Sequence, residues 1–326
     1  ISMARLAAAT VERGFTTVRD LGGDVNGLMR AITDGHSQGP RIVRAGKMLT
    51  QPGGHGDPRS GEIEVASCGC LLDANVMSIV ADGPDAVRKA ARHLLRDGSD
   101  FLKIHVSGGV ASPSDPLESV QYTPEEIRIV VTEAQHRGTY VSAHAYTPEA
   151  IAMAVDAGVH CIEHGNLMDD DTAKLIASAG AVVVPTLVTF QARDDIGRQL
   201  GLPDANLAKN SVVLESGLES LERAHGAGVT LGFGTDLIGE AQTRQNEELA
   251  IRGSVQPAAD VLRSMWTVNP QLCHLEGKIG VLQPDAFGDV VISNVDPIND
   301  ITAFAQHETA LAHVVQNGRP VVDRTD

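Results

Sequence analysis

Aromatic residues and long apolar runs are both scarce in this sequence of 326 residues. Phe, Trp and Tyr together make up 3% of the chain, whereas all hydrophobic residues make up 42%, so the core must be mainly aliphatic. No stretch approaches the ~20 apolar residues of a membrane-spanning helix, so we expect no membrane span. The charged fraction of 21% is typical of a compact folded protein rather than a disordered chain.

Basic residues are also in short supply. The 26 Lys and Arg residues face 42 Asp and Glu residues, which gives a formal net charge of −16. Nucleic acids and anionic membranes repel such a surface, so we expect neither as a partner. An acidic surface also favours solubility, which is the simpler explanation of the charge.

Four cysteines occur, at positions 68, 70, 161 and 273. The spacing of Cys68 and Cys70 matches neither a redox CxxC pair nor a zinc ribbon, and we interpret all four as free thiols. Residues 1–6 do not form a signal peptide and resemble the middle of a helix, so we expect a further segment before them. A cytoplasmic location is favoured, with a secreted or periplasmic one left open because a signal could lie in that segment.

Short β-rich runs alternate with amphipathic helices through the first 240 residues. The expected strands cover residues 15–20, 41–45, 101–106, 140–144, 159–164, 181–185 and 229–236. The expected helices cover residues 83–97, 124–137, 147–158, 170–179 and 204–227. Repeated strand–helix units with glycine at the helix ends predict an α/β fold with a parallel sheet. Seven strands are one short of a closed (β/α)8 TIM-like barrel, and we expect its first strand to precede residue 1.

An open doubly wound sheet is the alternative architecture, but no GxGxxG follows a first strand. The pattern changes after residue 280, where short β runs cover residues 289–292, 313–316 and 320–322. Asn317-Gly318 predicts a hairpin turn between the last two runs. We therefore predict a barrel domain over residues 1–280 and part of a small β-sandwich domain over residues 281–326.

Four polar residues, each closing a different predicted strand, are candidates for the chemistry. They are Lys103, His144, His164 and Asp236. Barrel enzymes place catalysis at the carboxyl ends of their strands. Each residue alone has an ordinary structural explanation, but together they indicate a metal site, because imidazole and carboxylate groups suit zinc and similar divalent ions.

The motifs around these residues resemble the amidohydrolase superfamily. They read LKI at 102–104, SAHAY at 142–146, IEHG at 162–165 and FGTD at 233–236. The segment GKMLTQPGGHGD at 46–57, together with Lys103, resembles the Xaa-Pro dipeptidase (prolidase) and carboxypeptidase-like branch, to which imidazolonepropionase-like and ochratoxin-hydrolysing amidases are related. Residues 279–297 are similar to the family's return into its β domain.

The resemblance implies two divalent metal ions, zinc being favoured, bridged by a lysine that CO2 has carboxylated. Lys103 matches the bridging lysine, while His144 and His164 match the ligands of one metal. Asp236 matches the ligand of the other metal and the residue that carries a proton from the attacking hydroxide to the leaving amine.

The same resemblance gives four more residues a role towards the substrate. His55 would contact the substrate carbonyl or carboxylate, and the Tyr146 hydroxyl would stabilise the oxyanion. Gly108 and Gly109 would shape the carboxylate site. Ordinary explanations stay open for each: a surface loop histidine, a tyrosine at the barrel mouth and a tight turn.

One part of the family pattern is absent. The family's first strand ends in His-x-His, and no His-x-His occurs in this sequence. We expect those ligands before residue 1, and a binuclear amide hydrolase that cleaves a small carboxylate-bearing substrate, such as an Xaa-Pro or other dipeptide or an N-acyl amino acid. The alternatives are a cyclic-amide hydrolase of imidazolonepropionase type and a catalytically inactive scaffold. We also expect a homo-oligomer, as in many relatives.

Overall fold

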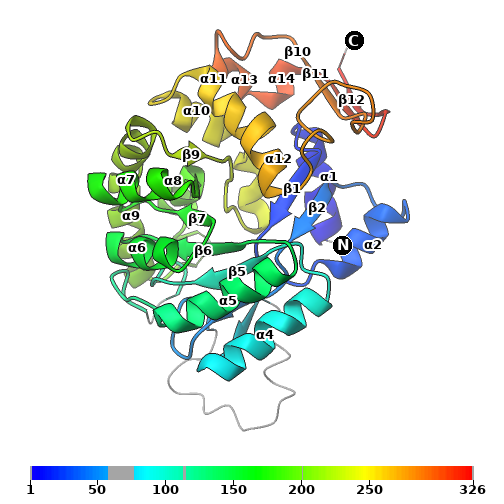
Figure 1. Cartoon of the computed structure of the whole chain (residues 1–326). Helices are drawn as coiled ribbons and strands as arrows, with labels where there is room; N and C mark the ends of the chain where they lie inside the picture. The colour runs from blue at the N-terminus through cyan, green and yellow to red at the C-terminus, as the bar shows by residue number, and fades with distance from the viewer. Residues whose placement is uncertain (1, 58–76, 113–114, 200, 325–326) are drawn as a thin grey trace.

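A computed structural model describes residues 2–57, 77–112, 115–199 and 201–324 (Figure 1). Its main element is a parallel seven-stranded sheet with strand order β4-β3-β5-β6-β7-β8-β9. The strands are β3 (Met48–Thr50), β4 (Ser78–Val80), β5 (Leu102–His105), β6 (Val141–Ala145), β7 (Cys161–His164), β8 (Val182–Val184) and β9 (Thr230–Leu231). The predicted α/β fold with a parallel sheet is therefore confirmed.

Two further strands, β1 (Thr17–Asp20) and β2 (Arg41–Arg44), form a separate parallel pair. The chain turns between β2 and β3 at Gly46, whose φ of +74° favours glycine. The backbone of Arg44 is bonded to Asp100 just before β5, which joins the pair to the main sheet. No ladder connects β9 to β1 within the described ranges, so closure into a complete barrel stays a prediction.

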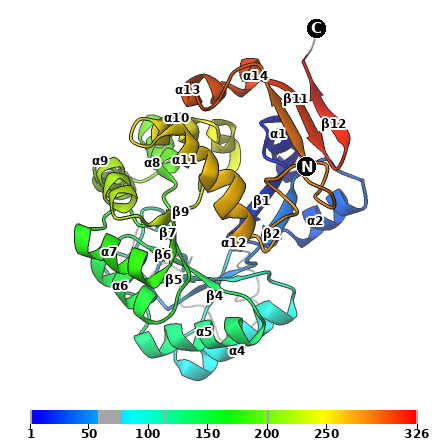
Figure 2. The same cartoon turned by 45° about the horizontal axis from the view of Figure 1, so that its top comes forward.

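Helices pack around the sheet (Figure 2). Those that alternate with its strands are α4 (Pro84–Arg96), α5 (Pro124–His136), α6 (Pro148–Asp156), α7 (Asp170–Ala179), α8 (Leu187–Ile196) and α9 (Asp204–Gly226), and α1 (Ser2–Glu12) and α2 (Asn26–Thr33) precede them. The largest buried cluster consists almost entirely of Ala, Val, Leu and Ile from these strands and helices, which confirms the predicted aliphatic core.

The predicted strand over 229–236 is shorter in the structure, because β9 ends at Leu231. The Asn269 side chain accepts a hydrogen bond from the Phe233 amide and donates one to the Phe233 carbonyl, at 3.0 and 2.8 Å. The Gly232 carbonyl accepts a hydrogen bond from Arg252. Tertiary contacts thus take the backbone groups that a longer strand would use.

The segment after β9 contains short helices and then a small sheet. The helices are η1 (Gly239–Arg244), α10 (Glu247–Gly253), α11 (Ala258–Arg263), η2 (Ser264–Val268), α12 (Asn269–Leu272), α13 (Ile301–Phe304) and α14 (His307–Ala310). The strands β10 (Val290–Ser293), β11 (Leu311–Gln316) and β12 (Arg319–Asp323) are antiparallel. Both residues of the Asn317-Gly318 turn have positive φ, as the predicted hairpin requires.

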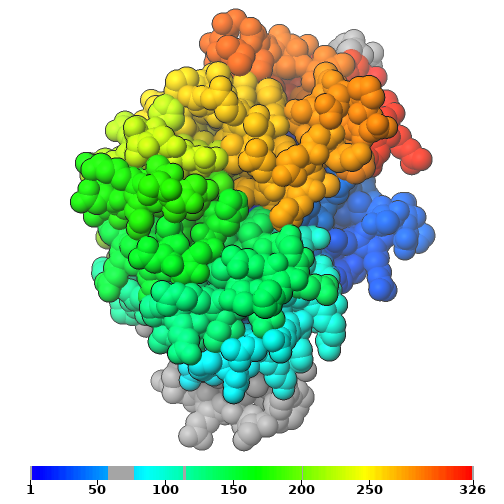
Figure 3. Space-filling model, viewed as in Figure 1, coloured from blue at the N-terminus to red at the C-terminus, as the bar shows by residue number. Residues whose placement is uncertain are grey.

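The small sheet packs against the rest of the molecule, and in Figure 3 the orange and red C-terminal segments lie against the yellow one. Val314 of β11 lies in one buried cluster with Val11 of α1 and Leu249 of α10. A single three-stranded sheet is present in this part of the described chain, so a β-sandwich and the boundary at residue 280 stay predictions.

None of the described helices is both long and apolar enough to cross a bilayer. Cys161 and Cys273 are buried free thiols, as predicted, whereas Cys68 and Cys70 lie outside the described residues.

Candidate active site

Three neighbouring strands bring the predicted ligand residues together at one end of the sheet. In the β5–β6–β7 register His105 is opposite His144, and Ala145 is opposite His164. The ring centroids of His144 and His164 lie 4.7 Å apart. The charge of Lys103 shifts the pKa of both rings and of Asp236, which follows β9, so all four predicted residues share one site.

Lys103 is buried without a partner. Its side chain is 3% exposed, and no described residue forms a hydrogen bond with Nζ. Burial lowers the pKa of the amine to about 8, although the nearby Glu163 opposes this change. The neutral amine, the form that reacts with CO2, is therefore far more populated than in an exposed lysine.

A buried ion pair lies beside this amine. Arg19 of β1 donates a hydrogen bond of 2.8 Å to Glu163 of β7, which also accepts one of 2.6 Å from Ser142. The Arg19 charge keeps the pKa of the Glu163 carboxyl below its usual value despite burial. Glu163 is therefore an anion that is already paired with Arg19 and not with Lys103.

The two histidines each have one ring nitrogen engaged. His164 Nδ1 lies 2.7 Å from Thr186 Oγ1, and His144 Nε2 lies 3.1 Å from the Gly108 carbonyl. Within the described ranges, no partner occupies His164 Nε2 or His144 Nδ1. Burial holds the pKa of both rings well below the usual value, so both are neutral. A neutral imidazole fixed through its second nitrogen is typical of a metal ligand.

Strained backbone marks the strand ends that carry the site. His164, Thr186 and Asp236 have φ values of +74°, +50° and +49°, a region that residues other than glycine rarely adopt. Such strain concentrates at functional sites, where surrounding contacts maintain it. Here the Thr186 hydroxyl bonds His164, and the Thr189 hydroxyl donates to the Asp236 carbonyl at 2.9 Å.

The Asp236 side chain is 40% exposed. Arg193 of α8 lies beside it, with Nη2 3.6 Å from Oδ2. Desolvation raises the pKa of Asp236, and the charges of Arg193 and Lys103 offset part of that increase. A raised pKa brings the carboxyl closer to the range in which it can accept and release a proton near neutral pH.

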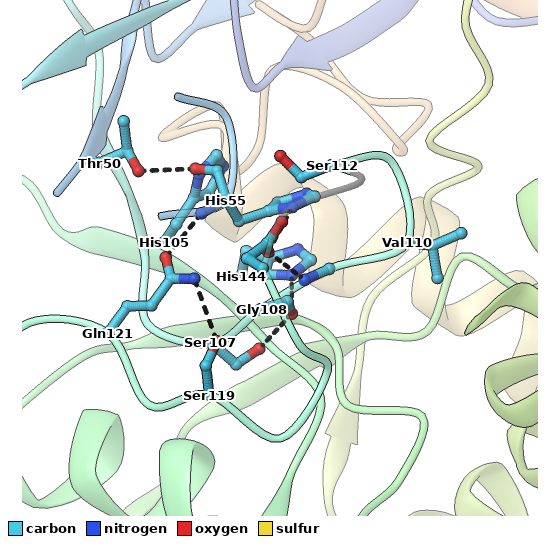
Figure 4. Close-up of polar contacts among 12 residues, drawn as sticks. Thr50, His55, His105, Ser107, Gly108, Val110, Ser112, Ser119, Gln121 and His144 are labelled. Atoms are coloured by element: carbon cyan, nitrogen blue, oxygen red, sulfur yellow. Dashed lines mark hydrogen bonds and ion pairs between the residues drawn. The ribbon is translucent and has the colours of Figure 1, made fainter. Parts of the chain in front are cut away.

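The loop after β3 carries His55 to the site (Figure 4). The His55 ring stacks on the His144 ring, with centroids 4.4 Å apart and planes at 19°. Its backbone amide donates to Gln121, and its carbonyl accepts from Thr50 at 2.7 Å and contacts His105 Nδ1. Nδ1 of His55 lies 3.2 Å from a carboxylate oxygen of Asp115.

Gly108 and Gly109 are required by close packing. A Cβ on Gly109 would lie 2.2 Å from the His55 ring, and one on Gly108 would lie 1.7 Å from the Pro116 carbonyl. Their amides donate to the Ser119 carbonyl at 2.9 Å and to Asp115 at 2.7 Å. These amides are therefore engaged within the protein, and the predicted contact of the two glycines with substrate stays a prediction.

Tyr146 is buried beside the two histidines. Its side chain is 2% exposed, and its ring centroid is 4.7 Å from His144 and 5.4 Å from His164. Burial raises the pKa of its hydroxyl, so the group remains a neutral donor. Its predicted role at the oxyanion stays a prediction.

Three residues that contribute to the site have no recognisable signal in the sequence. Arg193 lies on a helix, Thr186 carries no motif, and Asp115 meets His55 only through the fold. Glu163 lies inside the IEHG motif, directly before His164, so its buried ionic partner could have been sought. Among the described side chains, no three of His, Cys, Asp and Glu converge closely enough to form a metal group by themselves.

A sequence model of the amidohydrolase family matches residues 1–321. The chain belongs to the amidohydrolase family. This confirms the superfamily predicted from the strand-end motifs. Together with the relatives below, it also confirms a hydrolase that acts on C–N bonds.

Relatives of this amidohydrolase lie in the predicted branch. A prolidase structure in complex with N-methylphosphonate-L-proline is 43% identical, covers 99% of this chain and 79% of its own, and has a TM-score of 0.94. An Xaa-Pro dipeptidase structure with bound methionine is 29% identical over 97% of this chain and 77% of its own, with a TM-score of 0.87. Ochratoxinase from Aspergillus niger is 31% identical over 98% of this chain and 68% of the ochratoxinase.

Proposed function

We propose that this amidohydrolase cleaves the amide bond of a small substrate with a free carboxylate: an Xaa-Pro dipeptide, another dipeptide or an N-acyl amino acid. The observation that carries the proposal is the buried Lys103 amine, which lacks a hydrogen-bond partner among the described residues and interacts with the charges of Asp236 and Glu163. The likeness to a prolidase and to an Xaa-Pro dipeptidase supports this substrate class.

The donor set fits a pair of divalent cations, with zinc as first choice. Lys103, His144, His164 and Asp236 would hold them, because among the described residues one ring nitrogen of each histidine and the lysine amine have no hydrogen-bond partner. Addition of CO2 to the neutral amine forms an N–C bond and releases a proton, which gives an anionic carbamate at Nζ. When bound, the cations would lower the pKa of a water molecule and polarise the scissile carbonyl.

The protein side chains would move the proton and hold the substrate. The Asp236 carboxylate would accept the proton of the attacking water and deliver it to the leaving nitrogen. His55 would donate a hydrogen bond to the substrate carbonyl or carboxylate, with its ring fixed by Asp115 and His144. The Tyr146 hydroxyl would donate to the oxyanion, and Gly108 and Gly109 would line the carboxylate site.

Metal analysis with a substrate panel tests the proposal. Purified protein should contain about two divalent ions per chain and should hydrolyse Ala-Pro or N-acetyl-proline. Lys103→Ala should lose metal and activity, whereas Lys89→Ala, an exposed lysine of α4, should retain both. Cleavage of cyclic amides alone would favour the imidazolonepropionase-like alternative. Full activity of Lys103→Ala would refute the bridging role, and absence of both metal and turnover would favour an inactive scaffold.

A cytoplasmic location and a homo-oligomer remain proposals. Light scattering during gel filtration would test the oligomer, because a mass equal to that of one chain would contradict it.

A further inference from the structure

Helix α8 begins without the side-chain cap that α5 and α6 have. Thr123 and Thr147 precede those two helices in extended backbone, with φ of −90° and −88°, and each side chain accepts a hydrogen bond from an amide of the first turn. Thr186 holds the same position before α8, but its φ is +50° and its side chain forms no capping hydrogen bond. The first amides of a helix have no partner within it, so α8 needs another acceptor.

That acceptor is Glu248 of α10, which lies 60 residues away in the sequence. Its Oε2 accepts a hydrogen bond of 2.7 Å from the amide of Val188, the second residue of α8. A threonine cap ordinarily accepts from an amide at this position. The Glu248 side chain has no exposed surface. Burial of a carboxyl group is far more costly than a threonine cap, so helix stability alone does not account for Glu248 here.

The Thr186 hydroxyl is engaged in the active site instead. Its Oγ1 lies 2.7 Å from His164 Nδ1, whereas His164 Nε2 has no partner among the described residues. Thr189, in the same first turn, donates from its hydroxyl to the Asp236 carbonyl at 2.9 Å. Both threonines are buried. The start of α8 therefore holds two of the four predicted metal ligands, and their positions depend on where that turn lies.

Arg252, one turn after Glu248 on α10, holds the neighbouring strand end. Its Nη1 donates a hydrogen bond of 2.7 Å to the Gly232 carbonyl, in the segment that leads from β9 to Asp236. The guanidinium group is fully buried, and its Nε donates to Gln256 at 2.8 Å. A buried acid and a buried base on one helix face thus fix the segments that follow β8 and β9.

We propose that Glu248 is a positioning residue for the metal site: it caps α8 from a second helix and thereby leaves the Thr186 hydroxyl to orient His164. A hydrogen bond at the second ring nitrogen of a metal-binding histidine fixes the ring, and its loss typically weakens metal binding by ~10–100-fold. The inference rests on the proposed function, since it requires that His164 binds a metal ion. It deepens that function by tracing the geometry of this ligand to a residue of α10.

Transfer of zinc from the purified holoenzyme to a chromogenic chelator tests the proposal, because it measures metal affinity independently of turnover. Glu248→Met removes the acceptor and should weaken zinc binding by about tenfold or more. Glu248→Gln keeps an oxygen for the Val188 amide and should restore most of the affinity. Glu247→Met, at the adjacent glutamate of α10, which is 46% exposed, is the matched control and should bind zinc as wild type does.

Thr186→Val tests the other end of the connection and leaves Glu248 in place. It should weaken zinc binding as much as Glu248→Met does. The double variant should lose little more than either single variant, because both remove the same interaction. Additive losses, or wild-type affinity in Glu248→Met, would overturn the proposal and leave Glu248 with a structural role only. If Glu248→Met does not fold, Glu248→Asp, which keeps the charge but has a shorter side chain, takes its place in the same comparison.

Failure of the proposed function has a different signature, because wild-type protein would then hold no divalent metal. The nitrogen-15 NMR signals of the His164 ring decide in that case, since they report the hydrogen bond at Nδ1 without a metal. A shifted Nδ1 signal in both Glu248→Met and Thr186→Val supports the inference, and an unchanged signal in Glu248→Met overturns it.

Discussion

The His55 ring stacks on the His144 ring at 4.4 Å, so a loop after β3 and the strand β6 meet at one face of the site. The His55 ring also lies directly against Gly109, where even a Cβ atom would not fit. The position of His55 is therefore set by three segments that are far apart in the sequence.

Gly109→Ala should disturb this arrangement. The added Cβ would lie 2.2 Å from the His55 ring, so either the ring or the loop must move. We expect kcat/KM to fall by at least about tenfold, since small misplacements near the reacting atoms are costly. Gly226→Ala is the control, because its Cβ meets nothing within 4 Å at the end of α9. Steady-state kinetics of both variants would decide, and wild-type activity in Gly109→Ala would show that His55 is not needed where it lies.

Lys209→Met should loosen the loop that carries Gly109 and Asp115. Its ammonium group donates to the Gly109 and Ser112 carbonyls, at 3.3 and 2.7 Å, and to the Asp115 carbonyl. Loss of these bonds should reduce the free energy of unfolding by about 1–3 kcal/mol and raise KM. Lys174→Met, at an exposed lysine of α7, should change neither quantity. Urea unfolding with parallel kinetics tests this, and an unchanged KM would contradict a positioning role.

Arg19→Met should be strongly destabilising. It would leave the Glu163 carboxylate buried, with its main ionic partner removed. Breaking a buried pair in this way costs about 3–5 kcal/mol. The double variant Arg19→Met/Glu163→Gln should recover part of that loss, because it removes the stranded charge. Denaturant unfolding of the two single variants and the double variant gives the coupling energy. Additive changes in the free energy of unfolding would contradict a stabilising interaction between Arg19 and Glu163.

Glu248→Gln should stabilise the protein more at pH 8 than at pH 5. Burial raises the pKa of Glu248 from 4.5 to about 7, although the Arg252 charge opposes this. Between these values the folded protein holds a proton that the unfolded chain has released, so the free energy of unfolding falls as pH rises, by on the order of 3 kcal/mol. Glutamine mimics the protonated form and avoids this loss. Thermal melts of both proteins at pH 5 and pH 8 check this prediction. An equal stabilisation by Glu248→Gln at the two pH values would argue against the raised pKa of Glu248.

The sequence was sufficient to predict which strand-end residues meet. Lys103, His144 and His164 follow from strand period and parallel order, because the carboxyl ends of parallel strands share one edge of the sheet. The structure brings them together with Asp236, although their chemical roles stay predictions. The Gly108 amide is bonded within the protein, and the predicted place of Gly108 at the carboxylate site stays a prediction.

Other features depend on tertiary contacts that no local pattern records. Arg193 lies on a helix, where an arginine is ordinarily a surface residue, and only the packing of α8 turns it towards Asp236. The early end of β9 results from the Asn269 side chain, which lies in a helix 36 residues away in the sequence. Strand propensity over 229–236 could not reveal that competition.

The Asn269 amide also takes the place of a neighbouring strand just beyond β9. Backbone N–H and C=O groups that are buried without a partner are costly, so the chain must satisfy them where a strand ends. At Phe233 both groups are already bonded to one side chain, which imitates the donor and acceptor of a neighbouring strand. A single asparagine thereby satisfies both backbone groups just beyond the last parallel strand, with no further strand needed there.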